Sequence, residues 1–159
     1  MRAFRLGLTG SIGMGKSATA RLFADHGLPV WDADQAVHRL YAPGGLAVAP
    51  VANLVPEAMK DHGIDRSALK EWLRGRPSGM AELEAVVHPL VALDRAAFLD
   101  KVRADIVVLD IPLLFEKGYE CEMDAVLVVT APAELQRSRV LSRPGMNEDQ
   151  FHDILARQL

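Results

Sequence analysis

Four short apolar runs mark the candidate strands of this chain, at about residues 4–9, 29–32, 106–111 and 125–130. The apolar residues of the last two runs are continuous and do not alternate with polar ones. Continuous apolar strands that are separated by helical segments are typical of a parallel sheet with helices on both faces. The pattern therefore predicts an α/β fold that is built on four parallel strands.

Helical patterns follow the first two runs. A helix is expected over residues 16–26, where Gly27 would end it because glycine readily adopts the left-handed conformation of a helix terminus. Asp34 should open a second helix that ends near residues 43–45. The chain therefore begins with a strand, a loop and a helix, in that order.

Two more helices are expected after the last run. Pro132 suits the first turn of a helix that extends to about Leu141, and Asn147 with Gln150 suits the start of the final helix. The final helix has an apolar face made of Phe151, Ile154, Leu155 and Leu159. Because no glycine or other cap signal ends this helix, we expect the C-terminal strand of the fold to be missing from this chain.

The stretch between the second and third runs shows no convincing strand. Apolar residues recur there at helical spacing after Ser78 as a candidate cap, at Leu83, Val86, Val87 and Leu90. Pro89 should break or kink this helix. The chain is therefore expected to divide into a core, residues 1–42 and 105–159, and a helical insertion, residues 43–104.

The composition fits one ordinary domain. Half of the 159 residues are hydrophobic and a quarter are charged, and the net charge of −3 gives no general basic field, so nucleic acid is not an expected partner. The single cysteine, Cys121, cannot form an internal disulfide. No apolar run resembles a signal peptide or is long enough to span a membrane. We expect a soluble cytoplasmic protein that is a monomer or a weak homo-oligomer.

One motif carries specific chemistry. Residues 10–17, Gly-Ser-Ile-Gly-Met-Gly-Lys-Ser, fit the phosphate-loop pattern G-x-x-x-x-G-K-[ST] between a candidate strand and a candidate helix. The loop amides would cradle phosphate oxygens, Lys16 would reach the β- and γ-phosphates, and the Ser17 hydroxyl would hold Mg²⁺. Lys16, as an exposed loop residue, should be replaceable with almost no loss of stability. The alternative is a glycine-rich turn that only joins strand to helix.

Three aspartates follow candidate strands, at the sheet edge where open α/β folds bind ligands. If the extended conformation persists, Asp32 and Asp34 lie about 6.6 Å apart on one face. A carboxylate there could accept the proton of an acceptor hydroxyl or help to order Mg²⁺. Alternatively, Asp34 is only a helix cap and Asp32 is a solvated strand end. Asp110 is either a metal-side aspartate or the cap of the following turn.

Three arginines, Arg137, Arg139 and Arg143, lie close together with no acidic residue between them. They could close over nucleotide phosphates as a lid, near residues 137–150, or they could form a solvated helix face. The five histidines show no metal-ligand spacing with one another or with Cys121, so we expect no zinc site.

Several of these segments, taken in order, resemble one family. Residues 7–17 (GLTGSIGMGKS), 30–34 (VWDAD), 88–90 (HPL) and 110–116 (DIPLLFE) resemble dephospho-coenzyme A kinase in order and spacing. The four segments together are far more specific than any one of them. The resemblance implies ATP-dependent phosphorylation of the ribose 3′-hydroxyl of dephospho-coenzyme A, the final step of coenzyme A biosynthesis. It also implies a P-loop three-layer fold with a helical substrate-binding insertion and a lid.

The resemblance further implies roles for single residues. Asp34 would be the general base, assisted in catalysis by Asp32 and Lys16. Acceptor contacts would come from Asp34, His88, Pro89, Leu113 and Glu116. The nucleotide would be bound by Ser11, Ile12, Gly13, Met14, Gly15, Lys16, Ser17, Ala18, Arg139 and Arg143. Mg²⁺ would be held by Ser17, with Asp110 as a candidate second ligand. Ser11 stands where the family commonly has glycine, which is compatible with phosphate binding if its φ is negative.

Two alternatives remain at this point, namely another P-loop nucleotide or small-metabolite kinase, and an ATP-binding module that transfers nothing. A switch GTPase is disfavoured because the chain has no Asn-Lys-x-Asp run and no aspartate followed three residues later by glycine. The chain is shorter than members of the family. The later lid residues and the adenine contacts are therefore expected to lie outside this sequence.

Overall fold

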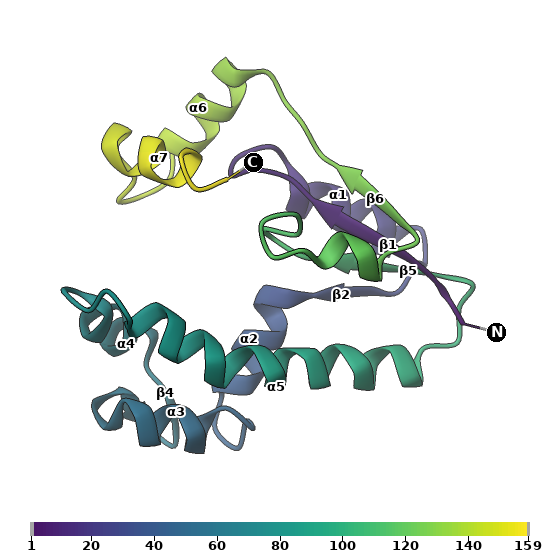
Figure 1. Ribbon diagram of the computed structural model, residues 1–159. Helices are drawn as coiled ribbons and strands as arrows, with labels where there is room; N and C mark the ends of the chain where they lie inside the picture. The colour runs from purple at the N-terminus through teal and green to yellow at the C-terminus, as the bar shows by residue number, and fades with distance from the viewer. Residues whose placement is uncertain (1, 159) are drawn as a thin grey trace. The chain divides into compact units, whose positions relative to one another are not determined.

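The computed structural model describes residues 2–158, which form two compact units. Unit 1 comprises Met1–Asp32 and Val102–Leu159, and unit 2 comprises Ala33–Lys101 (Figure 1). Unit 2 is therefore inserted between two parts of unit 1 along the chain.

The boundaries differ from those that the sequence pattern predicts, after residues 42 and 104. The first compact unit ends ten residues earlier, at Asp32, because residues 33–41 form a helix whose buried side chains Leu40 and Tyr41 belong to the core of unit 2. The sequence pattern identifies this helix but does not indicate which core its apolar side joins.

A four-stranded parallel sheet forms the centre of unit 1, in the order β2-β5-β1-β6. The strands are β1 (Phe4–Thr9), β2 (Val30–Asp32), β5 (Ile106–Asp110) and β6 (Ala125–Val128). They confirm the four predicted runs and their parallel arrangement. In the central strand β5, Val107, Val108 and Leu109 are all buried, which explains why this run is continuously apolar.

Helical segments complete the described part of unit 1. They are α1 (Lys16–Asp25), the 3-10 turn η2 (Tyr119–Glu122), α6 (Ala133–Leu141) and α7 (Glu148–Leu155). Gly27 follows α1 with a φ of 80°, and the Leu28 amide donates a hydrogen bond to the Phe23 carbonyl oxygen at 3.1 Å, as in a Schellman terminus. The predicted capping box of α7 is present, since the side chains of Asn147 and Gln150 each accept a hydrogen bond from the other's backbone amide.

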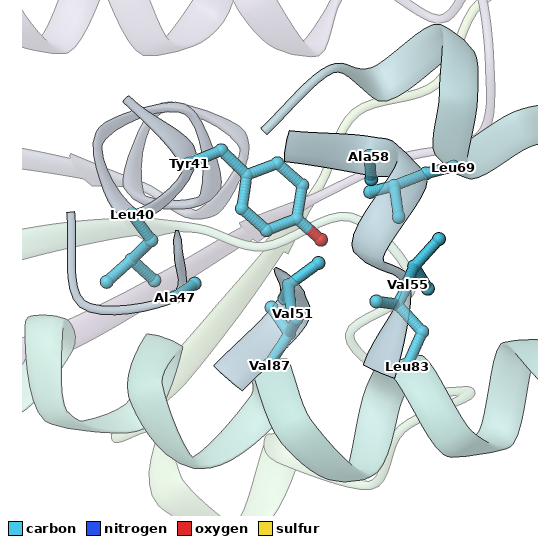
Figure 2. Close-up of a cluster of buried hydrophobic side chains, with 9 residues drawn as sticks. All are labelled: Leu40, Tyr41, Ala47, Val51, Val55, Ala58, Leu69, Leu83 and Val87. Carbon is cyan, nitrogen blue, oxygen red and sulfur yellow. The ribbon is translucent and has the colours of Figure 1, made fainter. Parts of the chain in front are cut away.

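Unit 2 is mainly helical. Its elements are α2 (Ala33–Tyr41), α3 (Val48–Leu54), the 3-10 turn η1 (Pro56–Ala58), β3 (Met59–Lys60), β4 (Gly63–Ile64), α4 (Arg66–Leu73) and α5 (Gly79–Lys101). One cluster of buried side chains holds them together (Figure 2). It comprises Leu40, Tyr41, Ala47, Val51, Val55, Ala58, Leu69, Leu83 and Val87. Burial of this apolar surface is the main driving force for folding of the unit.

A short antiparallel hairpin of β3 and β4 escapes the sequence pattern. Each strand has two residues, too few for alternation to be recognised. Asp61 and His62 form the turn, with positive φ values of 49° and 64°, as in a two-residue turn of type I′. Such turns usually contain glycine, so the usual sequence signal is absent.

Pro89 does not break α5, so the first of the two predicted effects is wrong, and a kink at this position stays a prediction. The helix extends over Gly79–Lys101 with Pro89 inside it. A proline in a helix interior costs about 3 kcal/mol. Burial of Leu83 and Val87 in the core of unit 2 offsets this cost, so tertiary packing overrides the local signal. Within residues 2–158, no helix combines the length and the apolar character needed to cross a membrane.

Candidate active site

The predicted phosphate loop connects the end of β1 to the start of α1. Gly13 and Gly15 have φ values of 76° and 103°, in the left-handed region that glycine adopts without steric cost. Ser11 is not among the described residues with positive φ, so the condition for a serine at this position is met. The Met14 amide donates a hydrogen bond to the Ser11 carbonyl oxygen at 3.2 Å, which closes the turn.

The loop packs directly against α6. A Cβ atom on Gly13 would lie 2.6 Å from Val140 Cγ2, so only glycine fits there. The side chain of Gln136, a residue only 5% exposed, donates a hydrogen bond from Nε2 to the Ile12 carbonyl oxygen at 2.8 Å. Arg139 Nη1 donates to the Gly13 carbonyl oxygen at 3.4 Å. Packing and hydrogen bonds therefore anchor α6 on the phosphate loop.

Lys16 forms an ion pair with Asp110 at the end of β5. The side chain of Asp110 is 2% exposed and that of Lys16 is 17% exposed. The prediction that Lys16 is an exposed loop residue is therefore wrong. Its ammonium group compensates a buried carboxylate, and such a partner cannot be removed without a large cost in stability.

Asp32 and Asp110 lie side by side, because they are partners in the register of β2 and β5. Asp34 does not extend this strand, since β2 ends at Asp32 and α2 begins at Ala33. The extended conformation does not persist to Asp34, so the condition for a separation of about 6.6 Å is not met. Asp34 is exposed in the first turn of α2, where the positive end of the helix dipole stabilises its carboxylate.

The three clustered arginines have different surroundings. Arg139 contacts the phosphate loop, and Arg143 is exposed just after the end of α6. Arg137 forms an ion pair with Glu148 at the start of α7 and so connects two helices. The expected basic cluster is therefore reduced to Arg139 and Arg143, because an acidic residue from beyond the cluster compensates Arg137.

A cavity of about 400 Å³ lies beside the loop within unit 1. Its lining includes Ser11 and Met14 of the loop together with Leu113 and Glu116, two of the expected acceptor residues. The other lining residues are Thr9, Gly10, Phe115, Val128, Val129, Thr130 and Gln158. Leu113 has a φ of 57°, a conformation that costs a non-glycine residue about 1–2 kcal/mol. Leu113, an expected acceptor residue with a strained backbone, thus lines the same cavity as the phosphate loop.

The remaining expected acceptor residues, His88 and Pro89, lie in the middle of α5 in unit 2. His88 is half-buried, and its Nε2 atom lies 3.9 Å from Oε1 of Glu84, one turn earlier on the same helix. Pro89 is exposed. The continuous helix holds the backbone of both residues in one conformation.

Sequence reasoning missed several side chains that contact the loop. Gln136 holds the Ile12 carbonyl oxygen, and Gln158 Oε1 accepts a hydrogen bond from the Ile12 amide at 2.9 Å. Met14 Sδ accepts one from the Ala131 amide at 3.0 Å. These contacts join residues at least 117 positions apart, so no local signal in the sequence could have indicated them.

Several known proteins are similar to this chain in sequence, and a solved structure is similar to it in architecture. A dephospho-CoA kinase of Cereibacter sphaeroides is 67% identical over 159 residues, which cover 100% of this chain and 81% of that protein. A dephospho-CoA kinase of Ruegeria pomeroyi is 55% identical over 156 residues, 98% of this chain and 79% of that protein. A crystal structure of a protein from Thermus thermophilus matches with a TM-score of 0.87 and 35% identity, covering 100% of this chain and 82% of that one. A family model described as dephospho-CoA kinase matches residues 4–159, and the phosphate loop lies between β1 and α1 as the motif requires. The chain therefore belongs to the dephospho-CoA kinase family.

Proposed function

We propose that this chain transfers the γ-phosphoryl group of ATP to the ribose 3′-hydroxyl of dephospho-coenzyme A, giving coenzyme A and ADP as the final step of coenzyme A biosynthesis. Membership of the family supports this function. The structural observation that carries it is the phosphate loop, with left-handed Gly13 and Gly15 and with Lys16 fixed at the sheet edge by Asp110. We also propose that the protein is cytoplasmic, that it is a monomer or weak homo-oligomer, and that neither nucleic acid nor a membrane is its partner.

The loop and the start of α1, residues 11–18, are the proposed site of the ATP phosphates. The Ile12 amide already donates to a neutral oxygen acceptor, the side chain of Gln158, and an anionic phosphate oxygen accepts such a bond more strongly. The Lys16 ammonium offers three donors, so it can contact phosphate oxygens while it remains paired with Asp110. Arg139 and Arg143 are the proposed lid residues that add positive charge on the other side.

The residues at this sheet edge also fit Mg²⁺. This ion prefers oxygen ligands and is usually held by one or two carboxylates together with waters and substrate phosphates. Ser17 has an exposed hydroxyl in the first turn of α1, and Asp110 ends the strand beside Asp32. We propose Ser17 as a protein ligand of Mg²⁺, with Asp110, the ion-pair partner of Lys16, as the candidate second ligand. When bound, the ion would neutralise charge on the transferred phosphoryl group.

Asp34 is the proposed general base. Its exposed carboxylate would accept the proton of the 3′-hydroxyl as the hydroxyl oxygen attacks the γ-phosphorus. Asp32 would assist from the end of β2, and Lys16 would stabilise negative charge in the transition state. The other proposed acceptor contacts are His88, Pro89, Leu113 and Glu116.

A coupled assay of ADP release, with and without dephospho-coenzyme A, tests the function. We expect ADP release that depends on the acceptor and a product that carries one additional phosphate at the 3′-position, identified by mass and by phosphorus NMR. ADP release at the same rate without the acceptor would instead show an ATP-binding module that hydrolyses ATP. Faster turnover with a different nucleotide or small metabolite would show another P-loop kinase.

Replacement of Asp34 by asparagine tests the general base. Asparagine keeps the size of the side chain and removes only the interaction of its charge with the helix dipole, worth about 0.3–1 kcal/mol at an exposed position, so the fold should be preserved. We expect kcat to fall by about 10²–10⁴, with little change in KM for ATP. Glu134→Gln is the matched control, because it removes an acid from the first turn of another helix, α6. If both variants keep the wild-type kcat, Asp34 is a helix-end residue and not the base.

A further inference from the structure

One buried side chain at the phosphate loop has no role in the proposal above. Among residues 2–158, the buried polar residues are Thr9, Asp110 and Gln136. Thr9 ends β1, directly before the loop, and Asp110 pairs with Lys16. Gln136 instead belongs to α6 and is only 5% exposed. A buried amide side chain is costly unless it is hydrogen-bonded, so the bonding of Gln136 is an obligatory part of the folded site.

Gln136 lies on the side of α6 that faces the loop. Gln136, Arg139 and Val140 stand at positions i, i+3 and i+4, so they share one side of the helix. Gln136 Nε2 donates a hydrogen bond to the Ile12 carbonyl oxygen at 2.8 Å. Arg139 Nη1 donates to the Gly13 carbonyl oxygen at 3.4 Å, and a Cβ atom on Gly13 would lie 2.6 Å from Val140 Cγ2. The middle of α6 therefore holds residues 12 and 13 in particular.

The bond from Gln136 sets the direction of the Gly13 amide. The Ile12 carbonyl oxygen and the Gly13 N–H belong to one peptide group, and in a planar trans peptide they point in opposite directions. Because Gln136 holds the oxygen, the N–H points away from the side-chain amide of Gln136. Among residues 2–158, no atom accepts a hydrogen bond from this N–H, so a phosphate oxygen can do so. Glycine, with a φ of 76° here, restricts its backbone less than any other residue, so this direction needs an external bond.

The hydrogen bond of Gln136 is compatible with a bound nucleotide. A carbonyl oxygen and a phosphate oxygen are both acceptors, so a phosphate group cannot replace Gln136 at the Ile12 carbonyl oxygen. The Ile12 amide is different, because a phosphate oxygen can replace its acceptor, Gln158 Oε1. The amide side of Ile12 is thus exchangeable on nucleotide binding, whereas the carbonyl side stays with Gln136.

We infer that Gln136 is a positioning residue for ATP, because it holds the Ile12 carbonyl oxygen and thereby directs the Gly13 N–H toward the phosphate groups of the nucleotide. A donor that already has its binding direction costs less to order when the ligand arrives, so the bond of Gln136 increases the affinity for ATP. This inference rests on the part of the proposed function that places the ATP phosphates at residues 11–18. The property that matters is the N–H donor of Gln136, not the volume of its side chain.

Equilibrium titration with ATP and Mg²⁺, in the absence of the acceptor, tests the inference. Gln136→Met keeps most of the side-chain volume and removes the donor, and we expect the Kd for ATP to rise by about 3- to 10-fold. Leu135→Met is the matched control, because it places the same side chain at the neighbouring position of α6, which is 42% exposed. We expect this control to keep the wild-type Kd. Thermal unfolding of both variants establishes that each is folded at the temperature of the titration.

Gln136→Glu gives a readout that a purely structural role would not move. A protonated carboxyl group can donate a hydrogen bond to the Ile12 carbonyl oxygen, whereas a carboxylate cannot. Burial raises the pKa of a carboxyl group, so we expect the introduced group to be mostly protonated at about pH 5 and ionised at about pH 8. Relative to the wild type at the same pH, Gln136→Glu should bind ATP more tightly than Gln136→Met at the lower pH and more weakly at the higher pH.

Either of two results would overturn the inference. One is a Kd for ATP that is the same in Gln136→Met and Leu135→Met. The other is an ATP affinity of Gln136→Glu that, relative to the wild type, does not change between the two pH values, and this comparison also decides the question if Gln136→Met does not fold. Failure of the proposed function is a separate result. If the variants bind ATP in the expected order but the wild type does not phosphorylate dephospho-coenzyme A, the role of Gln136 is supported and the proposed acceptor is wrong.

Discussion

Replacement of Lys16 by alanine should destabilise the protein as well as inactivate it. The substitution leaves the carboxylate of Asp110, which is 2% exposed, without its ion-pair partner. Removing one member of a buried pair typically costs about 3–5 kcal/mol, because an uncompensated charge remains in the interior. For a chain of this size, each kcal/mol lowers the melting temperature by about 2–4 °C, so we expect a loss of about 6–20 °C.

Thermal unfolding without nucleotide or Mg²⁺ measures this effect. Trp31 in β2 is buried in unit 1 and Trp72 belongs to unit 2, so a Trp72→Phe background lets Trp31 fluorescence report on unit 1 alone. The double variant Lys16→Ala/Asp110→Asn removes both charges of the ion pair. We expect it to regain much of the lost stability, because the buried charge is then also removed.

Two results would refute this reasoning. A melting temperature of Lys16→Ala within about 1 °C of the wild type would mean that the ion pair contributes little and that Lys16 behaves as an ordinary exposed loop residue. A double variant that is less stable than Lys16→Ala would mean that Asp110 stabilises the sheet edge through groups other than the lysine.

Two further predictions concern the loop and the core of unit 2. Gly13→Ala should lower the melting temperature and raise KM for ATP, because it adds about 1–2 kcal/mol of backbone strain and a steric clash with Val140. The double variant Gly13→Ala/Val140→Ala should recover ATP binding only in part, since it relieves the clash but not the strain. A wild-type KM for ATP in Gly13→Ala would contradict this prediction. Burial raises the pKa of Tyr41 above its ordinary value of 10.0, against the opposing charge of Arg66. The folded state therefore keeps the hydroxyl proton of Tyr41 to higher pH than the unfolded state does. The corresponding contribution to the free energy of unfolding is present below pH 10 and is lost as pH rises further. Urea unfolding at pH values below and above 10 should show a smaller loss of stability in Tyr41→Phe than in the wild type.

The sheet and the phosphate loop could be predicted because their signals are local. Each buried strand is a short apolar run, and the loop is a contiguous motif with glycines where φ is positive, as at Gly13 and Gly15. The same holds for the terminus of α1 at Gly27 and for the cap of α7 at Asn147. Each of these features needs only residues that are close in sequence.

The pairing of charges could not be predicted in the same way. Lys16 and Asp110 are 94 positions apart, and nothing near Lys16 indicates that its ammonium group meets a buried carboxylate. Arg137 forms an ion pair with Glu148, which lies after the segment of clustered arginines that contains no acidic residue. The helix that contains Asp34 could be predicted, but the core that its apolar side joins could not, because Leu40 and Tyr41 pack against residues of unit 2 that are distant in sequence.

The proline inside α5 divides the helix into parts of unequal local stability. Residue 89 has no amide hydrogen, so it cannot donate the helical hydrogen bond to the carbonyl oxygen of Ala85, and the hydrogen-bond ladder has a gap there. The buried residues of the helix, Gly79, Leu83 and Val87, all precede the gap. Residues 92–101 can therefore open and exchange their amide hydrogens without disruption of the core, whereas the first half opens only with the unit as a whole. His88 lies at the junction, on the last turn that belongs to the slowly exchanging half.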